Sequence, residues 1–88
     1  MRTVIEDECV SDVVDREQAK FPRLVDAYDA LKWWLARRPE QGFLMDDINW
    51  ICKQRGDRDQ DIPALVAIYN FDQMFVTIRF ILVRIPAA

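Results

Sequence analysis

The 88-residue chain contains no histidine, two glycines and a single serine. Without histidine it lacks the side chain that most often acts as a general base near neutral pH, and also the commonest metal ligand. Its only serine, Ser11, stands beside acidic residues and has no histidine partner, which argues against a serine hydrolase. No glycine-rich phosphate-binding loop is present either.

The two cysteines, Cys9 and Cys52, do not have the spacing of a metal-binding motif. We expect both to be reduced and buried as small apolar side chains, with a disulfide as the less favoured alternative. Aspartates at 46–47 and at 57, 59 and 61 could supply oxygen ligands, but loop aspartates more often form turns. The sequence therefore predicts no cofactor and no metal, and a carboxylate–metal enzyme is the least favoured hypothesis.

Length and composition predict one domain that spans residues 1–88. A hydrophobic content of 51% is ample for a core and argues against disorder. The acidic N-terminus lacks the apolar centre of a signal peptide, and Arg79 and Arg84 interrupt the longest aliphatic run. We therefore expect a cytoplasmic protein with no membrane contact. The net charge of −3 means that binding to nucleic acid would require a local basic patch.

Hydrophobic periodicity predicts helices in the first half of the chain. A second, longer helix starts near Phe21 and ends before Pro39 and Gly42, whereas a first, short helix runs to Lys20. Ser11 or Asp12 would cap the first helix, and residues 3–5 form a short edge strand before it. The apolar face of the second helix consists of Phe21, Leu24, Val25, Tyr28, Leu31 and Leu35.

The period changes from 3.6 to 2 after Gly42, which predicts strands. The first includes Ile48, Trp50 and Cys52, and the next two span 64–71 and 75–85 around a tight turn at 72–73. The last strand has apolar residues on both faces, so we expect it to be interior and packed under the second helix. The predicted fold is α+β: two N-terminal helices on a small antiparallel sheet, with a C-terminal three-stranded meander.

Cations on or near the sheet are the strongest candidates for chemistry. One interpretation of Lys53, Arg55 and Arg58 is a binding site. The other, which we favour for that loop, is that they only keep a loop rich in aspartates in contact with solvent. Arg79 and Arg84 lie five residues apart and project to opposite faces unless a bulge intervenes. We expect Arg84 to reach a surface site and Arg79 to pair with a carboxylate such as that of Asp26 or Asp29, because an unpaired buried cation is costly.

Two adjacent tryptophans stand outside the predicted core face of the second helix. Trp34 lies about 100° from the centre of that face and Trp33 nearly opposite to it. An exposed tryptophan is either tucked under a neighbouring segment, here the N-terminal one, or part of a partner surface. A protein-interaction module that uses Trp33 and Trp34, for a protein partner or for a homodimer, is therefore one functional hypothesis.

The stretch FPRLVDAYDALKWWLARRPEQG, a charged connection and then IPALVAIYNFDQMFVTIRFILVRIP resemble the RelE/ParE superfamily of type II toxin–antitoxin toxins. The resemblance covers about residues 15 to 86. It rests on the spacing of Leu35, Pro39 and Gly42, and on a strand that closes with Tyr69 before a polar turn and a V-T-I strand at 76–78.

The resemblance implies a compact αα-ββββ fold, a cognate antitoxin that wraps the toxin, and one of two activities. RelE-like members cut mRNA on the ribosome with cations of the sheet and a tyrosine, whereas ParE-like members inhibit DNA gyrase. Carried over by position, Lys53, Arg55, Tyr69 and Arg84 are the candidate catalytic residues of a metal-independent endoribonuclease. An enzyme without histidine can cleave RNA if cations stabilise the phosphorane and a lysine or tyrosine moves protons.

The sequence departs from the family pattern at two points. Many members have an arginine at the position of Val66, and the family's nucleases are commonly basic, whereas this chain is acidic. Two hypotheses therefore stand side by side. One is a toxin, active or inactivated, and the other is a non-enzymatic interaction module.

Overall fold

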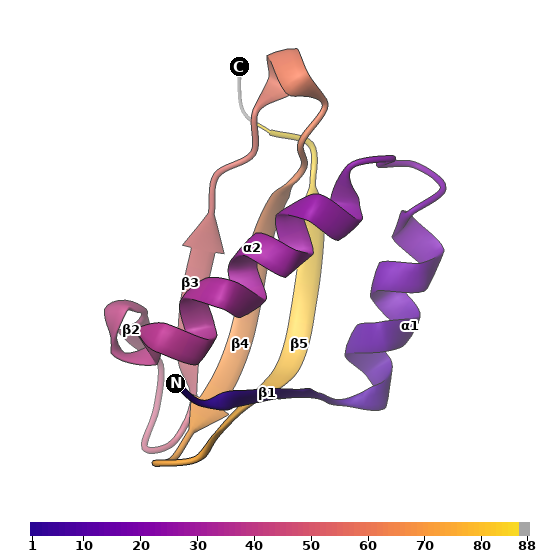
Figure 1. Ribbon diagram of the computed structural model, residues 1–88. Coiled ribbons are helices and arrows are strands. Elements are labelled where there is room, and N and C mark those ends of the chain that lie inside the picture. The colour runs from indigo at the N-terminus through magenta and orange to yellow at the C-terminus, as the bar shows by residue number, and fades with distance from the viewer. Residues whose placement is uncertain (87–88) are drawn as a thin grey trace.

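The computed structural model describes residues 1–86 and contains, within that range, two helices and a five-stranded sheet (Figure 1). The α+β class is thus confirmed. The elements, in chain order, are β1 (Thr3–Glu6), α1 (Glu8–Glu17), α2 (Leu24–Arg37), β2 (Phe43–Leu44), β3 (Trp50–Gln54), β4 (Ala64–Phe71) and β5 (Phe75–Arg84), with single 3₁₀ turns at Pro39–Gln41 and Arg58–Gln60.

The strand order is β1-β5-β4-β3-β2. The meander β3-β4-β5 is antiparallel as predicted, and β1 lies at one edge, where a short strand was expected. The prediction of a purely antiparallel sheet is wrong, because β1 pairs with β5 in parallel. The two helices connect β1 to the rest of the sheet and so provide the crossover that a parallel pair requires.

The helix boundaries differ from those that the sequence predicted. Helix α1 begins at Glu8, with Asp7 as the preceding cap residue, rather than after Ser11 or Asp12. Helix α2 begins at Leu24, because the segment from Phe21 forms a turn in which Leu24 N–H donates to the carbonyl of Phe21 at 2.9 Å. Ile48 lies outside β3, in a loop.

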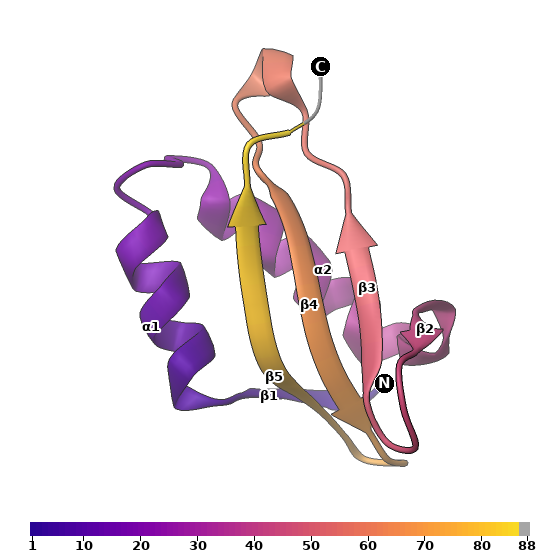
Figure 2. The same ribbon diagram turned by 180° about the vertical axis from the view of Figure 1, so that it is seen from behind.

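The core lies between α2 and one face of the sheet. The predicted cover of β5 is confirmed: Leu24, Tyr28, Leu31 and Leu35 of α2 are buried in the same cluster as the inward side chains of β5. Figure 2 shows the sheet from behind, with no helix in front of β3, β4 or β5. Within the described residues, therefore, only one face of the sheet is covered. We call the other face the open face.

A β-bulge at Arg79 explains why β5 is apolar on both faces. Ile78 pairs with Tyr69 and Phe80 pairs with Ile68, so Arg79 has no counterpart in β4. The extra residue shifts the alternation, because Ile78 and Ile81 are both buried although they are three residues apart. The bulge therefore reverses which positions of β5 face the core.

The bulge also exposes Arg79 to a partner. Its Nε lies 2.7 Å from a carboxylate oxygen of Asp7, the residue between β1 and α1. The predicted pairing with Asp26 or Asp29 is wrong, because Asp26 instead contacts Arg23, the residue before α2, and Asp29 contacts Lys32 of the same helix.

Tyr69 fastens the segment after α2 to the sheet. Its side chain is fully buried, and its hydroxyl donates to the carbonyl of Pro39 at 2.5 Å. Gly42 packs directly on the same hydroxyl, so that a β-carbon there would overlap the tyrosine oxygen and lie 2.8 Å from the carbonyl oxygen of Ile51. The residues of the P-x-x-G stretch and the tyrosine of the later strand therefore meet at one contact.

This contact predicts non-additive effects on stability. We expect Tyr69→Phe to lower the free energy of unfolding by about 1–2 kcal/mol, because the Pro39 carbonyl loses its buried donor. Gly42→Ala should cost about 1–3 kcal/mol through overpacking, and less in the Tyr69→Phe background, where the overlapping oxygen is absent. Urea denaturation of both single variants and the double variant measures the coupling, and strictly additive losses would contradict this contact.

Candidate functional site

The open face carries three neighbouring cross-strand rows of side chains. Residues two apart on a strand lie about 6.6 Å apart on one face, and adjacent strands are separated by about 4.8 Å. The row nearest the bulge is wholly apolar and has phenylalanine at both ends, whereas the next two rows contain cations. The rows are, in order, Phe43–Ile51–Ile68–Phe80, Lys53–Val66–Leu82 and Ala64–Arg84.

The basic cluster, defined as Lys53, Arg55 and Arg84, lies at one end of the sheet, where Lys53 and Arg84 are on the open face and Arg55 directly follows β3. All three side chains are exposed, and Lys53 and Arg55 line a hollow of about 480 Å³ where β3 and β4 separate. Arg84 projects from β5, two strands away and hence about 10 Å across the sheet. None of the three forms an ion pair with another residue in the range 1–86. Their positive charge is therefore available to a ligand.

Tyr69 does not belong to this cluster. Its neighbours in the register, Trp50 and Ile78, face the helices, and its hydroxyl is bound to Pro39. Burial raises the pKa of Tyr69 to about 12, so the phenol stays protonated at neutral pH. The structure thus brings Lys53 and Arg55 together at one hollow, places Arg84 on the same face as Lys53, and places Tyr69 on the opposite face of the sheet. The predicted role of Tyr69 beside these cations is wrong, because its alternation in β4 directs it into the core.

The remaining cations are used elsewhere. Arg79 is paired with Asp7, and Arg58 lines a separate pocket of about 370 Å³ together with Lys20 and Phe21. Arg58 therefore lies apart from the hollow that Lys53 and Arg55 line.

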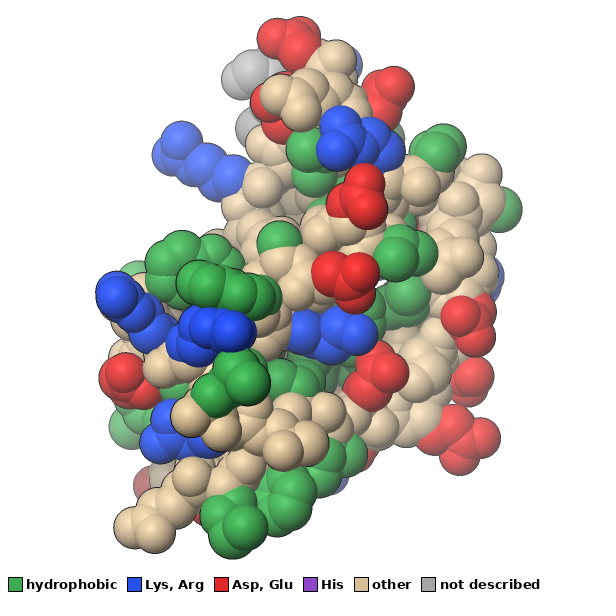
Figure 3. Space-filling model, in the orientation of Figure 1, with side chains coloured by type: hydrophobic (Ala, Val, Ile, Leu, Met, Phe, Trp, Pro, Cys, Tyr) green, Lys and Arg blue, Asp and Glu red, His purple; other side chains and the backbone are tan. Residues whose placement is uncertain are grey.

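The adjacent tryptophans are both half-exposed, at 51% for Trp33 and 46% for Trp34. Their rings meet edge to face with centroids 5.4 Å apart, and the guanidinium of Arg37 stacks on Trp33 at 4.0 Å. The N-terminal segment does reach this end of α2, where the N–H of Arg2 donates to the carbonyl of Ala36. The ring of Trp33 nevertheless stays exposed, so the alternative that this segment covers it is wrong. In Figure 3, large apolar and basic side chains gather on the left, over the C-terminal half of α2.

The cysteines and aspartates have mainly structural surroundings. Cys9 is exposed, contrary to the prediction that both thiols are buried, because Val10 and Val14 form the buried face of α1 and Cys9 lies outside it. Burial raises the pKa of the Cys52 thiol to about 11. Asp46 accepts backbone N–H groups of Ile48 and Asn49, which lower its pKa, and Asp57 accepts the N–H of Asp59. The described residues contain no group of three potential metal ligands.

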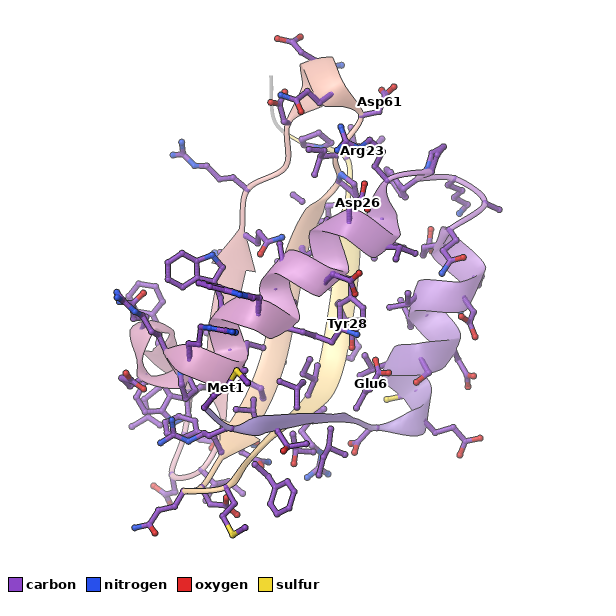
Figure 4. All side chains as sticks on the ribbon, in the orientation of Figure 1. Met1, Glu6, Arg23, Asp26, Tyr28 and Asp61 are labelled. Carbon is purple, nitrogen blue, oxygen red and sulfur yellow. The ribbon has the colours of Figure 1, made fainter. Side chains whose placement is uncertain are left out.

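Two features of the structure were not predicted from sequence. Tyr28 of α2 points toward Glu6 at the end of β1 (Figure 4), and its hydroxyl donates to that carboxylate. Burial and this bond raise the pKa of Tyr28. The second feature is a groove between α2 and β3, which Trp34, Arg38 and Cys52 help to line. Neither has a sequence signal, because each joins residues that are more than ten positions apart and share no motif.

Comparisons with known proteins leave the chain without an assigned relative. No protein-family model matches it, and no curated protein and no solved structure is significantly similar to it. None of the helices in residues 1–86 combines the length and the apolar character needed to cross a membrane.

The raised pKa values predict a loss of stability in alkali. Tyr69 and Cys52 bind their protons more tightly when folded, so unfolding releases protons and the extra stability is lost as pH rises from about 9 to about 12. The urea midpoint should therefore fall over this window, and by less in Tyr69→Phe. Denaturation at several pH values, with circular dichroism as the probe, measures this. An identical pH profile for Tyr69→Phe and the wild type would contradict the role assigned to the phenol.

Proposed function

We propose that this protein is the toxin component of a toxin–antitoxin pair and that its open sheet face binds RNA. The observation that carries the proposal is that Lys53 and Arg84 lie on one face of the sheet and that Arg55 lines the same hollow as Lys53, with no ion pair from any of the three to a carboxylate in residues 1–86. These are the three cations that the resemblance to RelE-like toxins selects. Lysine and arginine bind phosphates through charge-assisted hydrogen bonds, and these three exposed cations have no ion pair with another residue in 1–86.

The apolar row beside the cluster supports a single-stranded ligand. Phe80 is 44% exposed and Phe43 is 73% exposed, at the two ends of the row next to Lys53. Bases of single-stranded RNA stack on exposed aromatic rings while cations follow the backbone, which is the combination found on this face. The net charge of the chain opposes such binding, so affinity would depend on this local patch.

Cleavage places a further demand on the site. A metal-independent endoribonuclease needs cations for the phosphorane and a group that moves protons. With Tyr69 in the core, Lys53 is the candidate for proton transfer, while Arg55 and Arg84 would hold the phosphate. The cognate antitoxin would then have to cover or neutralise this face, and the ribosome would supply the mRNA.

Expression in a bacterium tests the proposal. We expect growth arrest that the product of the adjacent gene relieves, and loss of arrest in the triple variant Lys53→Ala, Arg55→Ala, Arg84→Ala. The matched control removes three exposed cations from the helical side, Arg16, Lys20 and Arg23, and should remain toxic. Unimpaired growth with intact mRNA in cells that accumulate the wild-type protein would refute an active toxin.

Direct binding gives an independent measure. With three phosphate contacts on a single strand, the logarithm of the binding constant should fall against the logarithm of salt concentration with a slope of about −2. The triple variant should lose this dependence. Fluorescence anisotropy with a labelled RNA oligonucleotide checks both values.

We also propose, as the alternative, a non-enzymatic interaction module of the gyrase-inhibitor type or an inactivated toxin. The exposed edge-to-face pair of Trp33 and Trp34 favours it, because tryptophan and arginine dominate the binding energy of many interfaces. The pair lies on α2, away from the open face, although Trp34 and Lys53 line one groove at the edge of β3.

Sedimentation velocity tests the self-associating form of this module. At micromolar concentration we expect a homodimer that Trp33→Ala dissociates, since truncation of a buried interface tryptophan commonly costs about 2 kcal/mol or more. Val25→Ala, a change at an exposed apolar residue on the same helix, is the control. A wild-type protein that sediments as a monomer throughout would exclude the homodimer.

A further inference from the structure

The groove between α2 and β3 has an apolar floor. Its volume is about 260 Å³, and Leu31 and Leu35 of α2, both almost fully buried, lie beside the half-buried Cys52 of β3. Because burial raises the pKa of that thiol, Cys52 contributes an uncharged sulfur rather than a thiolate. Trp34 forms one wall. The floor thus suits an aliphatic side chain of a ligand.

The rim of the groove is basic. Arg38 at the end of α2 and Lys53 of β3 are exposed, and no acidic residue is among the lining side chains. Arg38 lies over the ring of Trp34, with 5.7 Å between its guanidinium carbon and the ring centroid, and has no ion pair with any residue in 1–86. In a chain of net charge −3, this concentration of one sign is complementary to carboxylates.

The edge of β3 opens into the same groove. Strand β2 pairs with β3 only at Trp50 and Ile51, so the outer edge from Cys52 to Gln54 has no neighbouring strand in the described part of the chain. These three consecutive residues all line the groove. Successive side chains of a strand point to opposite faces of the sheet. Three consecutive residues can therefore line one groove only if the groove runs along the edge of the strand. Unpaired backbone groups at such an edge can accept another strand.

We propose that this groove binds an acidic polypeptide segment in extended conformation. The segment adds to the edge of β3 beyond Ile51, inserts one aliphatic side chain above Leu31, Leu35 and Cys52, and places carboxylates on Arg38 and Lys53. Backbone pairing provides affinity and the groove selects the side chain, which is the division of roles in strand addition. The proposal deepens the interaction-module alternative and does not require that the protein be a toxin.

Isothermal titration calorimetry with synthetic peptides tests the docking site. The probe is a short blocked peptide that alternates glutamate with valine and leucine. Its first comparison peptide has lysine in place of glutamate, and its second is N-methylated at alternate residues, which removes the N–H groups of one edge. We expect saturable binding of the acidic peptide only.

Two protein variants separate this site from the basic cluster. Arg38→Glu should weaken peptide binding about tenfold or more and leave RNA binding unchanged, whereas Arg84→Ala should weaken RNA binding and leave peptide binding unchanged. Arg16→Glu, the same charge reversal on α1, is the control. Slower hydrogen exchange at the Lys53 amide on peptide binding would locate the segment at the β3 edge.

Four results would overturn the proposal. The first is that the acidic peptide fails to bind the wild-type protein, and the second is that the N-methylated peptide binds equally well. The third is that RNA displaces the peptide in a manner that depends on Arg38. The fourth is that the protein self-associates and that Arg38→Glu abolishes this self-association. The third would assign the groove to nucleic acid and the fourth to a second copy of the chain. Because growth arrest is measured separately, failure here is distinguishable from failure of the toxin proposal.

Discussion

The bond from the Tyr69 hydroxyl to the Pro39 carbonyl is the constraint on which the rest of the arrangement depends. It ties the turn after α2 to β4, the central strand of the sheet, and Gly42 allows the chain to pass directly over that hydroxyl. From there β2 can begin and turn back to β3. The bond therefore sets the position of the end of α2, and with it the groove beside β3. It also commits Tyr69 to the core, which removes the phenol from any chemistry on the open face.

The bulge at Arg79 has a comparable effect on the other side of the sheet. Two β-branched residues, Ile78 and Ile81, can both face the helices only because one residue between them is left without a counterpart in β4. As a result Arg84 lies on the open face, in the row next to that of Lys53. Arg79, the extra residue of the bulge, forms an ion pair with Asp7, and this contact links the start of α1 to β5. One irregular position thus contacts the residue before α1 and sets which cation of β5 lies on the open face.

These two contacts also show which parts of the structure could be predicted from sequence. Periodic patterns located α2, the meander and the buried face that Leu24, Tyr28, Leu31 and Leu35 present, because hydrophobic burial acts on every residue of such an element. The parallel pairing of β1, the partner of Arg79 and the inward direction of Tyr69 could not be predicted in the same way. Each depends on register between segments distant in the chain, and a shift of one residue reverses the face on which a side chain lies. The basic cluster was selected by resemblance, and its position on one face followed from that register.

The distribution of burial explains why function falls on two separate surfaces. Helix α2 covers one face of the sheet, so the side chains that build the core are not available to a ligand, and the described residues leave the open face and the free edge of β3 without cover. On the open face, cations follow an aromatic row, which suits a phosphate backbone with stacked bases. At the edge of β3, cations border an aliphatic groove and unpaired backbone, which suits a polypeptide. Lys53 stands between the two, since its side chain contributes to both hollows. A polypeptide docked at the edge would therefore draw Lys53 toward its carboxylates and weaken the open face for phosphate, so that occupation of one surface would oppose occupation of the other.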